Sequence, residues 1–249
     1  MKSYYLTKNE LIDVCNRINE NYLPNDVEYY NKIDEVIEKV ELSPNEKIMF
    51  SFLELLKVID KEIVNIERKV DIQTSCNKGC YQCCYFPTIL SSLEAKLLTE
   101  YILSLPDERK INILNHLSNY YALNQDQLEK ACSVDFKTDT NYKTKYLVEQ
   151  LRCPFLDADD NSCMIYEARP SSCRTYVNYC SPKVCSESNI PEEPLSFEFL
   201  HEFYFDALND LIQTLLQNGE EVINIEYPQD AYEYGYLPLM LAINLNRTK

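Results

Sequence analysis

Apolar residues return at helical spacing over several long stretches of the chain. The clearest stretch follows Ser43, where apolar side chains recur on one helical face as far as about Val70. This period predicts one long amphipathic helix. The segment Ser43-Pro44-Asn45-Glu46 marks its start, because serine and the glutamate form a capping box and proline suits the first helical turn. The pairs Thr7/Glu10 and Ser91/Glu94 predict two further helix starts in the same way.

The same periodicity predicts helices through much of the remaining chain, over 93–105, 108–121, 141–151 and 197–216. Pro106 ends the first of these, and Asn218-Gly219 is a typical C-cap for the last. Apolar and polar residues alternate over 222–227, which predicts a short strand before Pro228. We therefore expect a mainly α fold with little sheet.

Glycine is scarce, with only three glycines in 249 residues. Tight hairpins and phosphate-binding loops both depend on residues that accept positive φ. This composition argues against a many-turned β architecture and excludes Rossmann-type and P-loop nucleotide sites.

The chain is acidic, with a net charge of −16 at pH 7. This charge repels nucleic acid phosphates, and no run of lysine or arginine offsets it. The N-terminus lacks the apolar core of a signal peptide, and no stretch approaches the ~20 apolar residues of a membrane span. We expect a cytoplasmic protein that binds neither nucleic acid nor membrane, and its oligomeric state is left open.

Cysteine is the main chemical clue, with eleven residues in a chain long enough to fold without crosslinks. Clustered thiols in a reducing compartment more often bind metal than form disulfides. Four of them lie within the nine residues from Cys76 to Cys84, directly after the long helix. Gaps of two to four residues let a turn, here at Gly79, aim successive sulfurs at one metal. The adjacent Cys83 and Cys84 point in different directions in most backbones, so their division between centres is left open.

The spacing Cys76-x3-Cys80-x2-Cys83 also matches the signature of radical S-adenosylmethionine enzymes. Those enzymes place this loop after a strand of a β/α barrel and use glycine-rich cofactor contacts. In this chain a helix precedes the loop, and Gln82 stands where that family usually has an aromatic residue. The radical enzyme is therefore the less favoured alternative.

Five more cysteines lie in a second segment, 153–185. Cys153-Pro154-Phe155-Leu156 and Cys163-Met164-Ile165-Tyr166 flank a turn rich in Asp, Asn and Ser. This pattern predicts a small β-hairpin that brings Cys153 near Cys163. The segment continues with Arg169-Pro170-Ser171-Ser172-Cys173-Arg174 and ends with Cys180 and Cys185.

The order C-x3-C-x2-C-C, then C-P-F-L, then C-M-I-Y-E-A-R-P-S-S-C-R resembles the YkgJ-like cysteine-cluster family. Its domain is described as zinc- or iron-chelating, and a related domain occurs in FliB-type flagellin lysine methylases. The resemblance covers roughly 74–186 and implies a loop-rich metal-binding core. A helical region at 1–73 and a helical extension at 187–249 flank this core, and we expect one compact unit. The resemblance implies metal ligands at nine cysteines: Cys76, Cys80, Cys83, Cys84, Cys153, Cys163, Cys173, Cys180 and Cys185.

Nine candidate thiols exceed the four that satisfy one tetrahedral zinc or one four-iron cluster. The chain therefore has either two centres or one centre with spare thiols. Lys78, Arg169 and Arg174 are the candidate cofactor-binding residues, because a centre with four thiolates carries negative charge that nearby cations offset. Either arginine could equally hold a carboxylate or a backbone carbonyl of the loop.

The remaining cysteines and both histidines are expected to be structural. Cys15 belongs to an apolar helix face, and Cys132 is isolated at the end of a helical segment. His116 and His201 fall within helical patterns far in sequence from the thiols.

These patterns favour a metal-binding protein that holds iron, as a cluster of the 4Fe-4S type or as iron ions, with zinc as the alternative. One hypothesis is an iron-dependent enzyme that modifies a protein or peptide, by analogy with the methylase domain. The chain is shorter than such methylases and has no glycine-rich cofactor loop, so methyl transfer is not inferred. The second hypothesis is a non-catalytic module in which closed zinc coordination fixes the loops. Thiol redox chemistry or metal storage ranks last, because an isolated C-x-x-C on a βαβ unit is missing.

Overall fold

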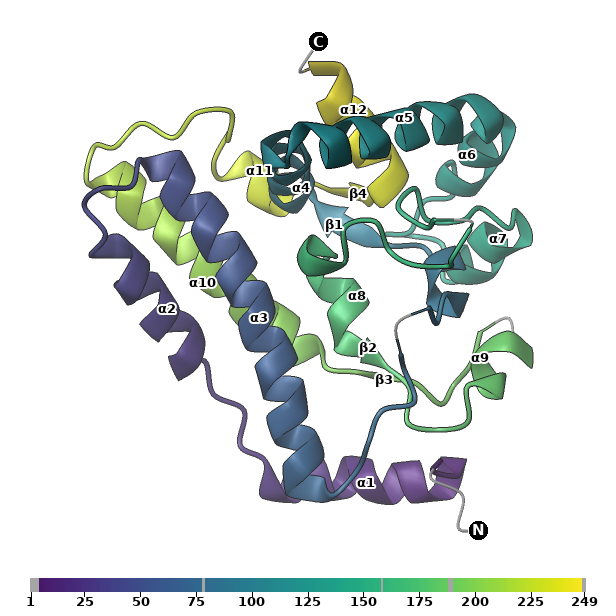
Figure 1. Cartoon of the computed structure of the whole chain (residues 1–249). Coiled ribbons are helices and arrows are strands. Elements are labelled where there is room, and N and C mark those ends of the chain that lie inside the picture. The colour runs from purple at the N-terminus through teal and green to yellow at the C-terminus, as the bar shows by residue number, and fades with distance from the viewer. Residues whose placement is uncertain (1–4, 78, 158, 188–189, 248–249) are drawn as a thin grey trace. The chain divides into compact units, whose positions relative to one another are not determined.

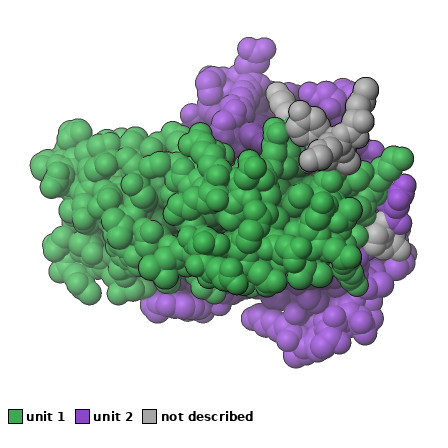
Figure 2. Space-filling model, turned by 90° about the horizontal axis from the view of Figure 1, so that it is seen from below, with its two compact units in different colours: residues 1–77, 170–184, 192–227 green, residues 78–169, 185–191, 228–249 purple. Residues whose placement is uncertain are grey.

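The computed structural model describes residues 5–77, 79–157, 159–187 and 190–247 and is mainly α-helical, as predicted (Figure 1). The chain forms two compact units, each assembled from separate segments (Figure 2). Unit 1 consists of Met1–Asn77, Pro170–Val184 and Glu192–Tyr227, and unit 2 consists of Lys78–Arg169, Cys185–Pro191 and Pro228–Lys249. The predicted boundaries after residues 73 and 186 stay a prediction. Every helix in the described ranges is too short or too polar to cross a lipid bilayer.

Unit 1 is built on the four helices α1 (Lys8–Asn21), α2 (Val27–Ile37), α3 (Pro44–Val70) and α10 (Glu198–Gln217), with short elements beside them. The short elements are α8 (Ser171–Thr175), β2 (Tyr176–Val177) and β3 (Leu195–Ser196). The short strands β2 and β3 pair antiparallel.

Helix α3 begins and ends where the sequence predicts. The Ser43 side chain accepts a hydrogen bond from the Glu46 backbone N–H, and the Glu46 carboxylate accepts one from the Ser43 backbone N–H at 2.8 Å. Pro44 occupies the first helical turn, and Asp71 ends the helix in the left-handed region with φ 53°. The same reciprocal capping box starts α1 at Thr7.

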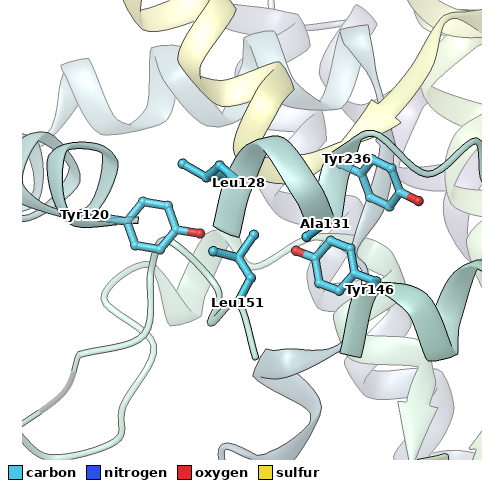
Figure 3. Close-up of a cluster of buried hydrophobic side chains, with 6 residues drawn as sticks. All are labelled: Tyr120, Leu128, Ala131, Tyr146, Leu151 and Tyr236. Atoms are coloured by element: carbon cyan, nitrogen blue, oxygen red, sulfur yellow. The ribbon is translucent and has the colours of Figure 1, made fainter. Parts of the chain in front are cut away.

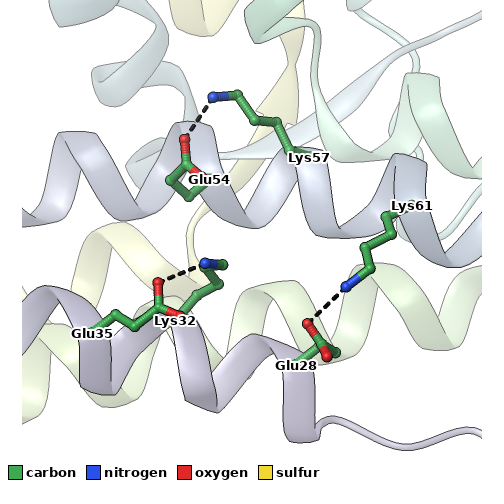
Figure 4. Close-up of polar contacts among 6 residues, drawn as sticks. All are labelled: Glu28, Lys32, Glu35, Glu54, Lys57 and Lys61. Atoms are coloured by element: carbon green, nitrogen blue, oxygen red, sulfur yellow. Dashed lines mark hydrogen bonds and ion pairs between the residues drawn. The ribbon is translucent and has the colours of Figure 1, made fainter.

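Helix α3 is the centre of unit 1 and packs against α1, α2, α8 and α10. Its inward face is almost fully buried, and Ile48, Phe52, Leu55 and Ile59 are 0% exposed. On the opposite side, an ion pair of 3.0 Å between Lys61 and Glu28 connects α3 to α2, beside further pairs within each helix (Figure 4). Burial of the apolar stripe therefore holds the helices together, and the exposed charges keep the outer face soluble.

Unit 2 consists mainly of shorter helices. Its elements are η1 (Gln82–Tyr85), β1 (Ile89–Ser91), α4 (Ser92–Ser104), α5 (Asp107–Leu123), α6 (Gln125–Cys132), α7 (Tyr142–Val148), η2 (Tyr166–Ala168), α11 (Gln229–Tyr232), β4 (Tyr234–Tyr236) and α12 (Leu237–Arg247). Helix α9 (Lys183–Glu187) contains the boundary between the units, which follows Val184.

The C-terminal segment is part of the body of unit 2. Strand β4 pairs antiparallel with β1, with Ile89 opposite Tyr236, and α12 packs against α4. The Lys96 ammonium and the Asp230 carboxylate form a buried ion pair of 2.6 Å. Lys96 and Asp230 are 134 positions apart in the sequence, so these contacts join distant segments of the chain.

An aromatic cluster fills one part of the unit 2 core. It combines side chains from α5, α6, α7 and β4 with Leu151, which follows α7 (Figure 3). The rings of Tyr146 and Tyr236 stack with centroids 5.3 Å apart. The buried Tyr120 hydroxyl donates a hydrogen bond of 2.8 Å to the Arg152 carbonyl, which precedes Cys153. The cluster thus fixes the backbone that leads into the second cysteine segment.

The predicted strand at 222–227 is wrong. The Ile223 backbone N–H donates to the Asn45 side-chain oxygen at 2.9 Å, and its carbonyl accepts from the Asn45 side-chain nitrogen at 2.8 Å. Asn224 is left-handed, with φ 66°. A side-chain amide has taken the place of a strand partner, and the backbone turns instead of extending.

The predicted hairpin after Cys153 is present in a minimal form. Leu156 and Cys163 form a single antiparallel bridge, and the Met164 N–H donates to the Phe155 carbonyl at 2.9 Å. The tip is closed by the Asp157 N–H, which donates to the Ser162 carbonyl at 2.9 Å.

Candidate metal centre

The two units divide the candidate ligands between them. Unit 1 contains Cys76, Cys173 and Cys180, and unit 2 contains the other six, Cys80, Cys83, Cys84, Cys153, Cys163 and Cys185. The predicted cofactor residue Lys78 lies outside the described residues. All eleven cysteines are described, and none forms a disulfide. Each unit therefore combines part of the first cysteine segment with part of the second.

In unit 2 the first cysteine segment turns sharply. Gly79 has φ +89°, a value that favours glycine, as expected for the predicted turn. The 3₁₀-helix η1 then carries Cys83 and Cys84, and the Cys84 N–H donates to the Tyr81 carbonyl at 2.9 Å. Successive positions of a 3₁₀-helix are rotated by about 120°, yet the Cys83 and Cys84 side chains are still hydrogen-bonded to each other.

The structure brings this turn together with the second cysteine segment of unit 2. The Cys153 N–H donates to the Cys84 carbonyl at 2.7 Å, and the Cys153 carbonyl accepts from the Leu156 N–H at 3.1 Å. The hairpin bridge then places Cys163 on the strand that returns beside Leu156. Backbone hydrogen bonds therefore link the 80–84 turn to the hairpin that carries Cys153 and Cys163.

Cys83 has the electrostatic surroundings of a metal-binding thiol. A hydrogen bond with Cys84 lowers the pKa of Cys83 to about 7, with a further contribution from the positive charge of Arg169. Desolvation by the surrounding protein opposes this shift, although the side chain keeps access to solvent. Thiolates are the form in which cysteine binds metal, and thus the donor set in this part of unit 2 fits zinc or iron.

Arg169 lies close enough to Cys83 for its positive charge to act on that thiol, and its predicted role as a cofactor-binding residue stays a prediction. Its guanidinium also lies over the ring of Tyr166, 4.7 Å from the ring centroid. Planar stacking of this kind holds an arginine in place while its charge acts on a neighbour.

Arg109 supports the same loop and was not identified from the sequence. This side chain on α5 donates to the Met164 carbonyl at 3.0 Å and to the Glu167 carboxylate at 2.8 Å. It therefore fixes the backbone immediately after Cys163. Its position in an ordinary amphipathic helix gives no local signal of this role.

In unit 1, Cys76 lies against the segment that leads to Cys180. The Asn178 N–H donates to the Cys76 sulfur at 3.4 Å, and the Ser75 N–H donates to the Asn178 carbonyl at 2.8 Å. Cys76 is exposed, whereas Cys180 is 2% exposed and forms a parallel bridge with Leu6. The N-terminal segment thus covers one of the predicted ligands.

Arg174 contacts a carboxylate of its own unit, the second of the two roles expected for it. Its guanidinium is 3% exposed and forms an ion pair with Asp60 on α3, whose side chain is 47% exposed. The neighbouring Cys173 lies in α8 and is half-buried. The observed ion pair accounts for the charge of Arg174, and its role as a cofactor-binding residue stays a prediction.

The residues expected to be structural have structural surroundings. Cys132 packs against the aromatic cluster, and burial raises the pKa of its thiol to about 12. His201 Nδ1 lies 2.8 Å from the Ser171 hydroxyl oxygen. Across the described ranges, no three histidine, cysteine, aspartate or glutamate side chains are already arranged as a metal site.

The comparisons with known proteins agree with the cysteine pattern. Residues 75–193 match the family model CxxCxxCC, whose description reads "Putative zinc- or iron-chelating domain". No curated protein and no solved structure matches the chain. The matched segment includes all nine candidate ligands and ends before α10.

Proposed function

We propose that this chain is a metal-binding protein that holds an iron–sulfur centre, and the match of residues 75–193 to the CxxCxxCC model of zinc- or iron-chelating domains supports metal binding. The observation that carries this proposal is the joining of the 80–84 turn to the Cys153–Cys163 hairpin through the 2.7 Å hydrogen bond between Cys153 and Cys84. This bond joins the backbones of two distant segments that both carry candidate thiols.

Four ligands for one centre are available within unit 2 alone. Cys80, one of Cys83 and Cys84, Cys153 and Cys163 lie on two backbone segments that are hydrogen-bonded to each other. A cysteine sulfur is repositioned by rotation about χ1, so we infer that metal binding selects the rotamers that turn these thiols toward one centre. When bound, a cluster of this type supplies one-electron redox chemistry.

The number of thiols leaves room for an iron–sulfur cluster and for more than one centre. A structural zinc and a four-iron cluster each take four protein ligands, and unit 2 offers six candidate cysteines and unit 1 three more. Arg169 beside Cys83 would offset the charge of several thiolates around one centre. We propose the iron–sulfur cluster first and zinc second, and metal analysis decides between them.

Structural zinc is the second candidate, and the short elements around the thiols favour it. The four-residue η1 and the single-bridge hairpin bury little apolar surface of their own. Metal coordination stabilises such loops in small metal-binding domains. In this case the bound metal would serve folding, and chelation would unfold the loops.

Anaerobic purification followed by iron, zinc and acid-labile sulfide analysis distinguishes the two candidates. An iron–sulfur centre gives coloured protein with iron and sulfide in comparable amounts. Colourless protein with zinc and no sulfide would overturn the iron–sulfur proposal in favour of structural zinc. Protein that binds neither metal under these conditions would overturn both.

Single substitutions then test the ligand set. Cys153→Ser and Cys163→Ser are expected to lower the metal content per chain by half or more, because each removes a thiolate that the proposed ligand set requires. Cys132→Ala is the matched control, since this half-buried cysteine of unit 2 lies outside the candidate set and packs against the aromatic cluster. Equal metal content in all three variants would contradict the proposed centre.

A further inference from the structure

Asn178 is a buried polar residue that connects two of the candidate ligands of unit 1. It follows β2, lies two residues before Cys180 and is 3% exposed. A buried amide needs hydrogen-bond partners for both its oxygen and its nitrogen. Asn178 finds all of its partners on the two segments that carry Cys76 and Cys180.

The backbone of Asn178 holds the segment around Cys76. Its N–H donates to the Cys76 sulfur at 3.4 Å, and its carbonyl accepts from the Ser75 N–H at 2.8 Å and from the Ser75 hydroxyl at 3.0 Å. The Thr74 hydroxyl donates to the same carbonyl at 3.2 Å and accepts from the Cys76 N–H at 3.0 Å. Three consecutive residues that end at Cys76 are therefore fixed to the backbone of one residue, Asn178.

The side chain of Asn178 closes the turn around Cys180. Its oxygen accepts from the Cys180 N–H at 3.1 Å, and its nitrogen donates to the carbonyls of Cys180 at 3.1 Å and of Ser181 at 3.4 Å. Only a side chain with both an acceptor and two donors can make this set of bonds. The same residue thus orients two ligand-bearing segments that are 102 residues apart in sequence.

We propose that Asn178 is a positioning residue for metal binding, which holds Cys76 and Cys180 in place as thiolate ligands. This inference rests on the proposed function, because Cys76 and Cys180 are counted among the candidate ligands that remain in unit 1 beside the four-thiol set of unit 2. Hydrogen bonds that orient the metal ligands affect the metal affinity of the site. Hydrogen bonds to the ligand sulfurs affect the reduction potential of an iron–sulfur cluster. Asn178 supplies both kinds of contact.

The first test uses metal-free protein and measures the alkylation rate of each cysteine by peptide mass spectrometry. Cys180 is 2% exposed, and its protection depends on the turn that the Asn178 side chain closes. Asn178→Ala is expected to raise the Cys180 alkylation rate about tenfold or more, since each lost hydrogen bond is worth about a factor of five to ten in local opening. Asn178→Asp keeps the acceptor for the Cys180 N–H and should give an intermediate rate.

The matched control is Asn45→Ala in the same unit. Asn45 also bonds both the N–H and the carbonyl of a distant residue, Ile223, yet it lies at the start of α3, whereas Cys76 follows the end of that helix. A helix of 27 residues is about 40 Å long. Loss of a comparable amide there should leave Cys180 alkylation unchanged.

The second test measures how metal binds, with Co²⁺ as the probe. The thiolate-to-cobalt charge-transfer absorption per bound Co²⁺ reports how many sulfurs coordinate the metal, and a purely structural role would not change it. We expect a lower absorption per bound Co²⁺ in Asn178→Ala, partial recovery in Asn178→Asp and a wild-type value in Asn45→Ala. If Asn178→Ala does not fold, as judged by far-ultraviolet circular dichroism, the cobalt absorption of Asn178→Asp relative to the wild type tests the proposal.

The two tests separate failure of this inference from failure of the proposed function. Wild-type protein that binds no iron, zinc or Co²⁺ overturns the proposed function, and the assignment of Asn178 with it. Metal binding with the same cobalt spectrum and the same Cys180 alkylation rate in all variants overturns the role of Asn178 alone. Faster alkylation with an unchanged cobalt spectrum likewise overturns it, because Asn178 would then serve the fold and not the ligands.

Discussion

The ion pair between Arg174 and Asp60 gives a prediction that separates the stability of unit 1 from metal binding. Asp60→Asn removes the carboxylate charge with almost no change in shape. It removes the negative charge beside the Arg174 guanidinium, whose side chain is 3% exposed. We expect the free energy of unfolding to fall while metal content stays the same.

The magnitude follows from the burial of the two partners. Removal of one partner of a fully buried ion pair costs about 3–5 kcal/mol. The Asp60 side chain is 47% exposed, so water reaches this side of the pair and screens part of the loss. We expect a cost of about 2 kcal/mol, close to that of a hydrogen bond between charged groups.

Urea unfolding followed by circular dichroism at helical wavelengths measures this cost. With a slope of about 2 kcal/mol per molar urea, the midpoint should fall by about 1 M. Glu28→Gln is the matched control, because it removes the exposed pair with Lys61 between α2 and α3 (Figure 4). Its cost should stay below about 0.5 kcal/mol.

Two outcomes would refute the reasoning. Equal midpoints for Asp60→Asn and Glu28→Gln would show that the burial of Arg174 adds nothing to the strength of its pair. Loss of metal from Asp60→Asn without loss of stability would show that the Arg174 charge serves the thiolates instead of the fold.

Three further predictions concern buried polar groups. Burial raises the pKa of Glu67, so the folded state holds this proton to higher pH than the unfolded state, and stability falls as pH rises through the raised pKa. Glu67→Gln should therefore increase stability at pH 7 but not at pH 4, and equal gains at both values would contradict this. Asp230→Ala leaves Lys96, which is 12% exposed, without its carboxylate and should cost about 3 kcal/mol in urea unfolding, whereas a cost below 1 kcal/mol would argue against a buried charge. Tyr120→Phe removes the hydrogen bond to the Arg152 carbonyl and should cost about 1 kcal/mol with unchanged metal content, and loss of metal instead would indicate that this bond holds the Cys153 segment in place.

Helices with complete local signals could be predicted from the sequence. The capping box at Ser43 and the apolar stripe that follows give α3 almost to the residue, because both depend only on neighbours in the chain. Gly219 likewise ends α10 in the left-handed region with φ +77°. Such elements need no knowledge of the tertiary structure.

Elements that depend on distant partners could not be predicted. Strand β4 exists because Tyr236 and its neighbours pair with β1, and no local alternation indicates it. The 222–227 segment has the alternation of a strand, but the Asn45 amide takes its backbone hydrogen bonds. A local sequence pattern cannot predict hydrogen bonding between segments that are more than a hundred residues apart.

The candidate site shows the same division. Cysteine spacing identifies the residue types that bind metal, since sulfur chemistry and turn length are local properties. The residues that orient the thiols belong to distant segments, and Arg109 is one example. Asn178 could have been suspected from one local signal, because asparagine often bonds the backbone two residues onward.

The bond between Asn178 and Cys76 also sets an order of events during synthesis. These two residues are 102 positions apart, and a ribosome that adds roughly 5–20 residues per second needs roughly 5–20 s to make that stretch. Cys76 is therefore synthesised several seconds before Asn178, the residue whose backbone holds it. Under the proposed function, metal bound in that interval would meet an incomplete set of thiols, so we expect loading to follow synthesis of the second cysteine segment.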